Sequence, residues 1–282
     1  MARAARRHRQ PAPLGAALKR EEKTMRPNAV RQKLERGEVV MGMMHFTASP
    51  MLVEVMASAG LDFFIIDLEH SPIDFDMAAH LVRAGDAAGI APLLRVPDVD
   101  PGLVKKVLNL GVQGLVLPHG TRESSQALLR AARYEPEGIR GSCPAVRQAN
   151  YGAAPNWQQF QAQANRELLV IPLIEDPATL QDFEALAATP GLDVFFLGPF
   201  DFSVAAAVPG AGFDHPVMAQ ALERMVKIAQ SHGKYIMTSV GDRIDTAVGR
   251  NVIRLGVRMI SYSADALVFR RACQDIAKLK VA

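Results

Sequence analysis

The sequence predicts an α/β protein that folds as a single-domain (β/α)8 TIM barrel. Three observations support this prediction. Eight short apolar runs alternate with amphipathic segments along most of the 282 residues, as in a parallel sheet covered by helices. Glycines recur between a helical segment and the next apolar run, where glycine ends helices in the left-handed conformation. No glycine-rich phosphate turn follows the first run, so a doubly wound open sheet is the less favoured alternative.

The predicted strands are short runs that are apolar almost throughout, as expected for parallel strands buried on both faces. They cover residues 39–45, 62–68, 91–96, 114–118, 168–174, 193–198, 234–239 and 257–262. Eight such strands, each followed by a helix, match the count of a closed (β/α)8 barrel.

The segments between the strands repeat apolar residues at helical spacing. They cover residues 49–60, 75–88, 100–110, 122–133, 177–188, 214–232, 242–255 and 264–279, and an earlier helical pattern begins at residue 25. Thr121 or Arg122 starts one helix, and Asp176-Pro177 starts another, because proline is favoured at the first helical position. The longest connection, residues 134–167, is expected to cover the active face.

Positive charge is concentrated at the N-terminus. Residues 1–24 carry seven basic and two acidic side chains, a net charge of +5. The whole chain has a net charge of +3, so the other 258 residues carry −2. We therefore expect a disordered basic extension over residues 1–24, with Met25 as an alternative start, and the (β/α)8 barrel over residues 25–282. The slightly acidic body gives no support for a nucleic-acid partner.

Several other function classes lack sequence support. Two cysteines, Cys143 and Cys273, make neither a disulfide framework nor a cysteine metal cluster, and a reducing, cytoplasmic location is expected. No apolar run reaches about 18 residues, so no membrane partner is expected. Nucleotide-binding and serine-hydrolase motifs are missing. The lysines lie in helical segments or, for Lys234, at the wrong end of a strand, which argues against Schiff-base chemistry.

Polar side chains follow the carboxyl ends of the predicted strands, where barrel enzymes place their chemistry. Glu175 and Asp201 follow the neighbouring strands five and six. Two carboxylates at that edge would repel each other unless they share a proton or a cation. Their oxygens suit Mg²⁺ or Mn²⁺, and Co²⁺ is also compatible. The alternative is that Glu175 caps a helix and Asp201 occupies a turn.

Arg95 ends the third strand, where an unpaired guanidinium would be costly. It therefore needs an anion, which is either a substrate oxyanion or a fixed carboxylate such as Glu69 or Glu175. The sequence leaves these two alternatives open.

His70 follows the second strand and is a candidate general base, because its unperturbed pKa is near neutrality. Asp67 and Glu69 share one strand face and could orient it. The alternative is a core or helix-capping histidine, and the same alternative is stronger for His119 and His45.

Six segments together resemble the HpcH/HpaI aldolase family, which are metal-dependent pyruvate aldolases with a TIM-barrel fold. They are IIDLEHSP (65–72), LLRVPDVDP (93–101), VLNLGVQGLVLP (107–118), RYEPEGIRG (133–141), LIEDP (173–177) and FLGPFDFS (196–203). The similarity runs in order from residue 34 to residue 270, and residues 1–24 have no counterpart.

The resemblance implies a role for each of these strand-end residues. Glu175 and Asp201 would be the metal ligands, and Arg95 would contact the ketone oxygen of pyruvate. His70, paired with Asp67, would belong to the acid/base apparatus. The turn Gly198-Pro199-Phe200-Asp201 would bind the pyruvate carboxylate through backbone amides near Phe200 and Asp201.

Some positions depart from the family pattern. Asn109 stands where well-characterised members have an Asp that reaches a neighbouring subunit's histidine. Leu173 replaces a Gln two residues before the metal-binding Glu, and Met44 replaces a Trp of the first strand. These departures affect the acid/base relay and the aldehyde pocket, for which His119 and Leu173 are the candidate lining residues.

The implied reaction is reversible cleavage of a 4-hydroxy-2-oxo acid, of the 4-hydroxy-2-oxoheptanedioate or 2-dehydro-3-deoxyglucarate type, into pyruvate and an aldehyde. One alternative is decarboxylation of oxaloacetate or another 2-oxo acid through the same enolate. Another is a non-catalytic protein that binds a metal and a 2-oxo acid. The resemblance also implies a homo-hexamer, built as a trimer of dimers that exchange their last helix.

Overall fold

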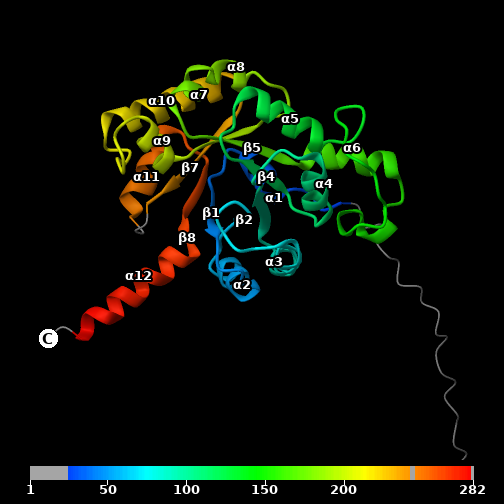
Figure 1. Cartoon of the computed structure of the whole chain (residues 1–282), viewed down its shortest axis with the longest axis horizontal. Helices are drawn as coiled ribbons and strands as arrows, with labels where there is room; N and C mark the ends of the chain where they lie inside the picture. The colour runs from blue at the N-terminus through cyan, green and yellow to red at the C-terminus, as the bar shows by residue number, and fades with distance from the viewer. Residues whose placement is uncertain (1–24, 242–244, 281–282) are drawn as a thin grey trace, which may run out of the picture.

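The computed structural model describes residues 25–241 and 245–280, so the predicted extension over residues 1–24 lies outside the described residues. Eight parallel strands form a closed barrel in sequence order (Figure 1). The strands are β1 (Val40–His45), β2 (Phe63–Asp67), β3 (Ala91–Arg95), β4 (Gly114–Leu117), β5 (Leu169–Ile174), β6 (Val194–Leu197), β7 (Tyr235–Val240) and β8 (Met259–Ala264). The predicted (β/α)8 barrel is therefore confirmed.

The helices lie around the barrel, and most begin at a side-chain cap or a proline near the first turn, as the sequence suggested. They are α1 (Ala29–Glu35), α2 (Pro50–Ser58), α3 (Phe75–Ala88), α4 (Pro101–Asn109), α5 (Arg122–Ala132), α6 (Trp157–Glu167), α7 (Pro177–Gln181), α8 (Phe183–Ala187), α9 (Pro199–Ala205), α10 (Pro216–Ser231), α11 (Thr246–Leu255) and α12 (Asp265–Ala277), with short 3-10 segments η1 (Arg147–Gly152) and η2 (Lys278–Lys280).

Most boundaries lie within two residues of the prediction, helices α6 and α9 were not predicted, and two segments differ in other ways. The segment 177–188 forms two short helices, α7 and α8, in place of one. Strand β8 continues to Ala264, beyond the predicted end at residue 262, because its register against β1 shifts between Gly42 and Met44. Ser263 accommodates this irregularity with a left-handed φ of 61°.

The prediction that residues 134–167 cover the active face is wrong. This segment follows α5, which runs back from the carboxyl ends of the strands, so the connection returns at their amino ends. Arg147 lies 2.6 Å from Asp86 near the end of α3, and it donates to the carbonyl of Leu110 just after α4. The segment contains η1 and α6 and packs against the amino-terminal side of the barrel.

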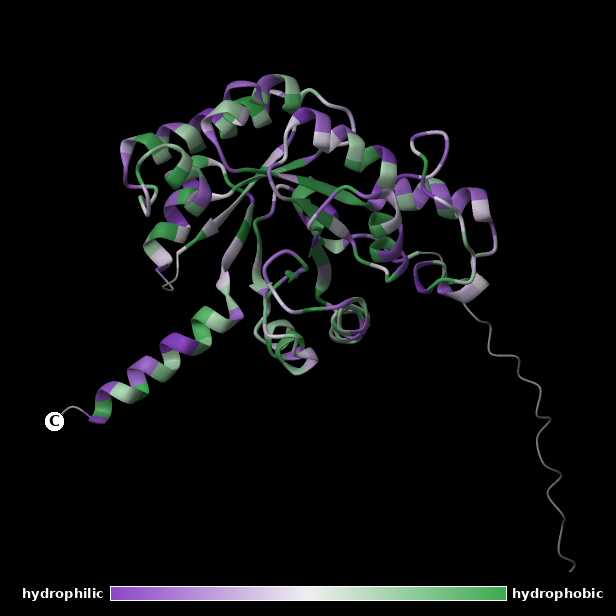
Figure 2. Cartoon of the chain, in the orientation of Figure 1, coloured by the Kyte–Doolittle hydropathy of each residue, from purple (hydrophilic) through white to green (hydrophobic). Residues whose placement is uncertain are grey.

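Alternating side chains form two apolar layers. One cluster fills the barrel and includes Phe63 and Leu93, and the other lies between strands and helices and includes Phe64 and Leu94. This alternation follows from the period-two geometry of a strand. In Figure 2 the strands are largely coloured as hydrophobic, while the covering helices carry both hydrophobic and hydrophilic residues.

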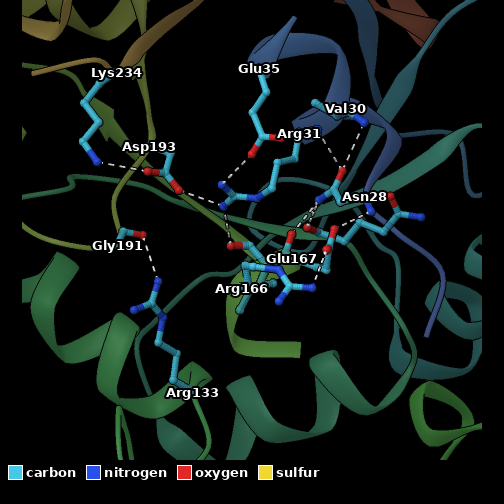
Figure 3. Close-up of polar contacts among 12 residues, drawn as sticks. Asn28, Val30, Arg31, Glu35, Arg133, Arg166, Glu167, Gly191, Asp193 and Lys234 are labelled. Atoms are coloured by element: carbon cyan, nitrogen blue, oxygen red, sulfur yellow. Dashed lines mark hydrogen bonds and ion pairs between the residues drawn. The ribbon is translucent and has the colours of Figure 1, made fainter. Parts of the chain in front are cut away.

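Helix α1 closes the amino-terminal end of the barrel. Its Val30 and Leu34 are buried in the cluster that fills the barrel. Asn28 caps the helix by accepting from the backbone of Val30 and Arg31, and its own amide donates to the carbonyls of Gln113 and Glu167 (Figure 3). The site must therefore lie at the opposite end.

An ion-pair cluster holds α1 in place (Figure 3). Arg31 lies 2.7 Å and Lys234 lies 3.0 Å from the carboxylate of Asp193, just before β6. Burial alone would raise the pKa of Asp193, but Arg31 and Lys234 outweigh burial and lower the pKa. Lys234 thus serves this structural cluster, in line with the prediction that it is not a Schiff-base lysine.

Helix α12 extends away from the barrel (Figure 1). Its start is anchored: the carboxylate of Asp265 accepts from the backbone N–H of Phe46 and Thr47 and lies 2.9 Å from Nδ1 of His45. Beyond this anchor its large apolar side chains are exposed, namely those of Leu267, Phe269 and Ile276. Among the described residues, no helix is long and apolar enough to cross a membrane.

Candidate active site

An ion pair between two strand ends forms the buried centre of the site. Asp67 ends β2, Arg95 ends β3, and the two residues are paired in register. The carboxylate of Asp67 accepts from Nε of Arg95 at 2.9 Å and from Nη2 at 2.7 Å, a bidentate geometry. Burial alone would lower the pKa of Arg95, but the hydrogen bond and charge of Asp67 outweigh it and raise the pKa. Arg95 therefore faces a fixed carboxylate and stays charged.

Glu69 connects Arg95 to His70. Its Oε2 lies 3.1 Å from Nη1 of Arg95 and 3.5 Å from Nε2 of His70. The imidazole is 62% exposed, so solvent and a small substrate can reach it. Sequence reasoning considered Glu69 only as an orienting group or an ion-pair partner of Arg95. Glu69 lies two residues after Asp67, and side chains at that spacing share one strand face. This spacing is the signal in the sequence that points to Glu69 as a site residue.

The contact between His70 and Asp67 differs from the one that the resemblance implies. Asp67 accepts the backbone N–H of His70 at 3.3 Å and that of Glu69 at 2.9 Å, while its two oxygens also bind Arg95. The carboxylate nearest the imidazole is that of Glu69. Asp67 thus positions the loop that carries His70, and Glu69 is the carboxylate beside the ring.

Glu175 follows β5 and is buried at the mouth of the barrel. Its Oε2 accepts the backbone N–H of His119 at 2.8 Å and lies 3.3 Å from Nδ1 of that residue. His119 reaches this position with a left-handed φ of 47°, which is uncommon for a residue other than glycine. Its side chain is exposed, as expected for a group at the rim of a pocket.

Glu175 and Asp201, which the sequence predicted as a carboxylate pair, follow the neighbouring strands β5 and β6. Burial raises the pKa of Glu175, and the negative charges of Asp201 and Glu69 raise it further, against the N–H of His119. Asp201 lies in the first turn of α9 and is exposed. The two groups are therefore close enough to repel each other, and a cation would relieve that repulsion.

The residues around this pair fit a small divalent cation. In the described part of the chain, no three or more His, Cys, Asp or Glu side chains gather where they could hold a metal ion, and Glu175 and Asp201 would supply two carboxylates. Gly198 keeps the space open: a Cβ there would lie 3.0 Å from Cγ and 3.5 Å from Oε1 of Glu175. Hard oxygen donors with room for water suit Mg²⁺ or Mn²⁺.

Two of the departures from the family pattern lie in the apolar interior below this pair. Leu173 and Met44 both belong to the buried cluster inside the barrel. Asn109 lies elsewhere: it ends α4 and its side-chain oxygen accepts from Arg140, so within one chain it does not join the site. His45 is also outside the site, because it is fully buried, packs edge-on against Phe64 and pairs with Asp265.

The chain as a whole matches a known protein family. The model of the HpcH/HpaI aldolase/citrate lyase family matches residues 41–272, most of the described barrel. The chain belongs to this family. HpcH/HpaI aldolases are carbon–carbon lyases that generally depend on a divalent metal, and this chain is an enzyme of that class. The alternative of a non-catalytic binding protein is therefore not retained.

Individual relatives agree with this assignment. The chain is 31% identical over 254 residues to a 5-keto-4-deoxy-D-glucarate aldolase of Salmonella arizonae, covering 89% of this chain and 96% of the relative. The solved HpcH/HpaI aldolase of Desulfitobacterium hafniense has a TM-score of 0.83 at 27% identity, covering 89% of this chain and 96% of that one. A family protein of Burkholderia cenocepacia has a TM-score of 0.82 at 31% identity, covering 90% and 100%.

Proposed function

We propose that this aldolase reversibly cleaves a 4-hydroxy-2-oxo acid into pyruvate and an aldehyde, with Mg²⁺ or Mn²⁺ held by Glu175 and Asp201. The observation that carries the proposal is the repelling carboxylate pair beside a fixed, charged Arg95 at the mouth of the barrel. The similarity to a 5-keto-4-deoxy-D-glucarate aldolase supports a dicarboxylic, hydroxylated member of this substrate class.

Glu175 and Asp201 would hold the cation next to the substrate's carboxylate and 2-oxo group. When bound, the cation supplies electrophilic activation of the 2-oxo group. The backbone of Gly198-Pro199-Phe200-Asp201 supports binding of the substrate carboxylate, because the first turn of α9 has N–H groups without intrahelical partners. Co²⁺ would fit the same oxygen donors.

Arg95 stabilises the charge that develops when the C3–C4 bond breaks. Cleavage leaves pyruvate enolate, whose oxygen is negative, and a preorganised guanidinium lowers the energy of that state. Asp67 and Glu69 hold the guanidinium in position on two sides, so it needs no rearrangement during the reaction.

His70 accepts the proton of the 4-hydroxyl group. Its imidazole is exposed and therefore accessible to the substrate, and the carboxylate of Glu69 lies 3.5 Å from Nε2. His119 and Leu173 contribute to the pocket for the aldehyde part, one at the rim and one in the barrel wall.

Decarboxylation of oxaloacetate is a second activity of the same site. It passes through the same enolate but needs no proton to leave a 4-hydroxyl group. One observation favours it: Asn109 is neutral and bonded to Arg140, so a carboxylate at that position is not available to a proton relay.

The metal proposal is tested by Glu175→Gln and Asp201→Asn. Each variant should lose at least about 10²-fold in aldol cleavage and in Mn²⁺ affinity measured by calorimetry, because the metal supplies several kcal/mol of charge stabilisation. The exposed Glu223→Gln on α10 is the matched control and should behave like the wild type. Full cleavage activity in either variant, or after complete chelation, would contradict the proposal.

The proposal also includes the oligomeric state of the enzyme. The exposed apolar side chains of α12 support a homo-hexamer in which this helix packs on a second copy, since an isolated helix in water gains nothing from them. The free, exposed Cys143 and Cys273 support a cytoplasmic location.

A further inference from the structure

His119, in the loop between β4 and α5, contacts one oxygen of the Glu175 carboxylate twice. Its backbone N–H donates to Oε2 of Glu175 at 2.8 Å, and Nδ1 of its ring lies 3.3 Å from the same oxygen. Within the described ranges, no other hydrogen bond or ion pair reaches the Glu175 side chain. His119 therefore holds Oε2, and the second oxygen, Oε1, is left without a partner from the chain.

The backbone of this loop is held against β5 just before Glu175. Gly120 donates its N–H to the carbonyl of Leu173 at 2.9 Å. A Cβ at position 120 would lie 2.6 Å from Cβ of Pro172 and 2.9 Å from the backbone nitrogen of Leu173, so only glycine allows this close approach. His119 enters the turn with its left-handed φ of 47°, a conformation that histidine adopts more readily than most residues other than glycine.

The other side of the loop is fixed by the start of α5. The backbone N–H of Thr121 donates to the carbonyl of His119 at 2.9 Å. The hydroxyl oxygen of Thr121 accepts the N–H of Ser124 at 3.2 Å and so caps the helix. All of these contacts lie within one chain, and none of them requires that His119 faces solvent. The position of the imidazole beside Glu175 is therefore set by β5 and α5 together.

The free oxygen of Glu175 faces the end of β6. A Cβ on Gly198 would lie 3.5 Å from Oε1, and Gly198 directly precedes α9, whose first turn carries Asp201. The same Cβ would lie 3.2 Å from Cδ1 of Leu173, so the wall below the carboxylate is apolar and offers no hydrogen-bond donor. The side chain that orients Glu175 therefore comes from the neighbouring strand β4 and not from β5 or β6.

We propose that the imidazole of His119 is a positioning group for Glu175, which fixes Oε2 and leaves Oε1 for the divalent cation. A carboxylate held through one oxygen is oriented before the cation binds, and partners that orient a ligand in this way increase metal affinity. This inference rests on the proposed function, in which Glu175 and Asp201 hold the cation. It gives the ring of His119 a role in addition to lining the pocket for the aldehyde.

The test is calorimetric titration of the full chain with Mn²⁺ in the absence of substrate, so that binding is measured and not activity. His119→Gly removes the ring, keeps the backbone N–H and accepts the left-handed φ without strain. We expect it to bind Mn²⁺ about 10-fold more weakly than the wild type. His119→Asn also tolerates this φ and restores a side-chain N–H donor, so it should recover most of the lost affinity.

Thr121→Ala is the matched control, because it removes the cap of α5 from the same loop without touching Glu175. It should lower Tm and leave the affinity for Mn²⁺ unchanged. Unchanged affinity in His119→Gly, no recovery in His119→Asn, or an equal loss in Thr121→Ala would overturn this inference and leave the metal site in place. Mn²⁺ binding that survives Glu175→Gln would overturn the proposed metal site and this inference with it.

Discussion

At the scale of single residues, Arg95 and His70 are held in very different ways. Arg95 is buried, hydrogen-bonded to Asp67 and ion-paired with Glu69, so its position is set before a substrate arrives. His70 is exposed and has one carboxylate near its ring. A fixed charge suits stabilisation of the enolate, and a mobile imidazole suits proton transfer.

This difference predicts separate effects on two reactions. Arg95→Lys should depress both aldol cleavage and oxaloacetate decarboxylation, by about 10²-fold or more, because both form the same enolate. His70→Ala should depress cleavage by about 10²–10⁴-fold and largely spare decarboxylation. The measurement is the steady-state rate of each reaction for each of the two variants, compared with the wild type.

Lysine at position 95 keeps a positive charge beside the Asp67 carboxylate, whereas alanine does not. Arg95→Ala would leave the buried Asp67 carboxylate without its partner, a loss that typically costs about 3–5 kcal/mol and could unfold the chain. Equal loss of both activities in His70→Ala would show that His70 positions the substrate and is not the base. Unchanged decarboxylation in Arg95→Lys would make Arg95 a structural ion-pair partner only.

At the scale of elements, the junction between β8 and α12 depends on one carboxylate. Asp265 links the start of α12 to the end of β1 through His45, Thr47 and the N–H of Phe46. Burial alone would raise the pKa of Asp265, but these contacts outweigh burial and lower the pKa well below its usual value. The ionised form is therefore stabilised in the folded chain.

The sign of the pH dependence follows from this lowered pKa. The contribution of Asp265 to the free energy of unfolding is present above the unfolded pKa, about 4, and is lost as pH falls toward the folded value. Asp265→Asn should therefore destabilise the protein by about 2–3 kcal/mol at pH 7, and the difference should shrink below pH 4.

Urea unfolding between pH 3 and pH 7, at one protein concentration, measures this difference. The exposed Asp214→Asn is the matched control and should follow the wild type at every pH. A deficit in Asp265→Asn that stays constant down to pH 3 would mean that the carboxylate's charge does not hold the junction.

At the scale of the whole molecule, the two chain ends have opposite expected roles in assembly. A chain that starts at Met25 should form a particle with the same number of subunits as the full chain, as derived from its mass by light scattering. Residues 1–24 carry +5 and few apolar side chains that an interface could bury. Phe269→Asp should lower the number of subunits in the particle, because it places a charge on the exposed apolar side of α12.

The exposed Gln274→Asp on the same helix adds the same charge at a polar position and should leave the mass unchanged. A smaller particle after removal of residues 1–24 would assign the extension a structural role. An unchanged mass for Phe269→Asp would leave α12 without a part in assembly.

The sequence by itself determined the eight strands, most of the helices and the polar residues at the strand ends. The eight strands, the exact span of α3 and the positions of Asp67 and Arg95 at strand ends follow from local periodicity and helix caps. The resemblance then assigned roles to Glu175, Asp201 and His70 that remain predictions.

The tertiary structure decided which of these groups meet. The register of β2 and β3 pairs Arg95 with Asp67, and the direction of α5 takes residues 134–167 away from the active face. His45 meets Asp265 across 220 positions because β1 and β8 close the barrel. Such contacts depend on barrel closure and strand register, which join segments far apart in the chain and therefore leave no local pattern in the sequence.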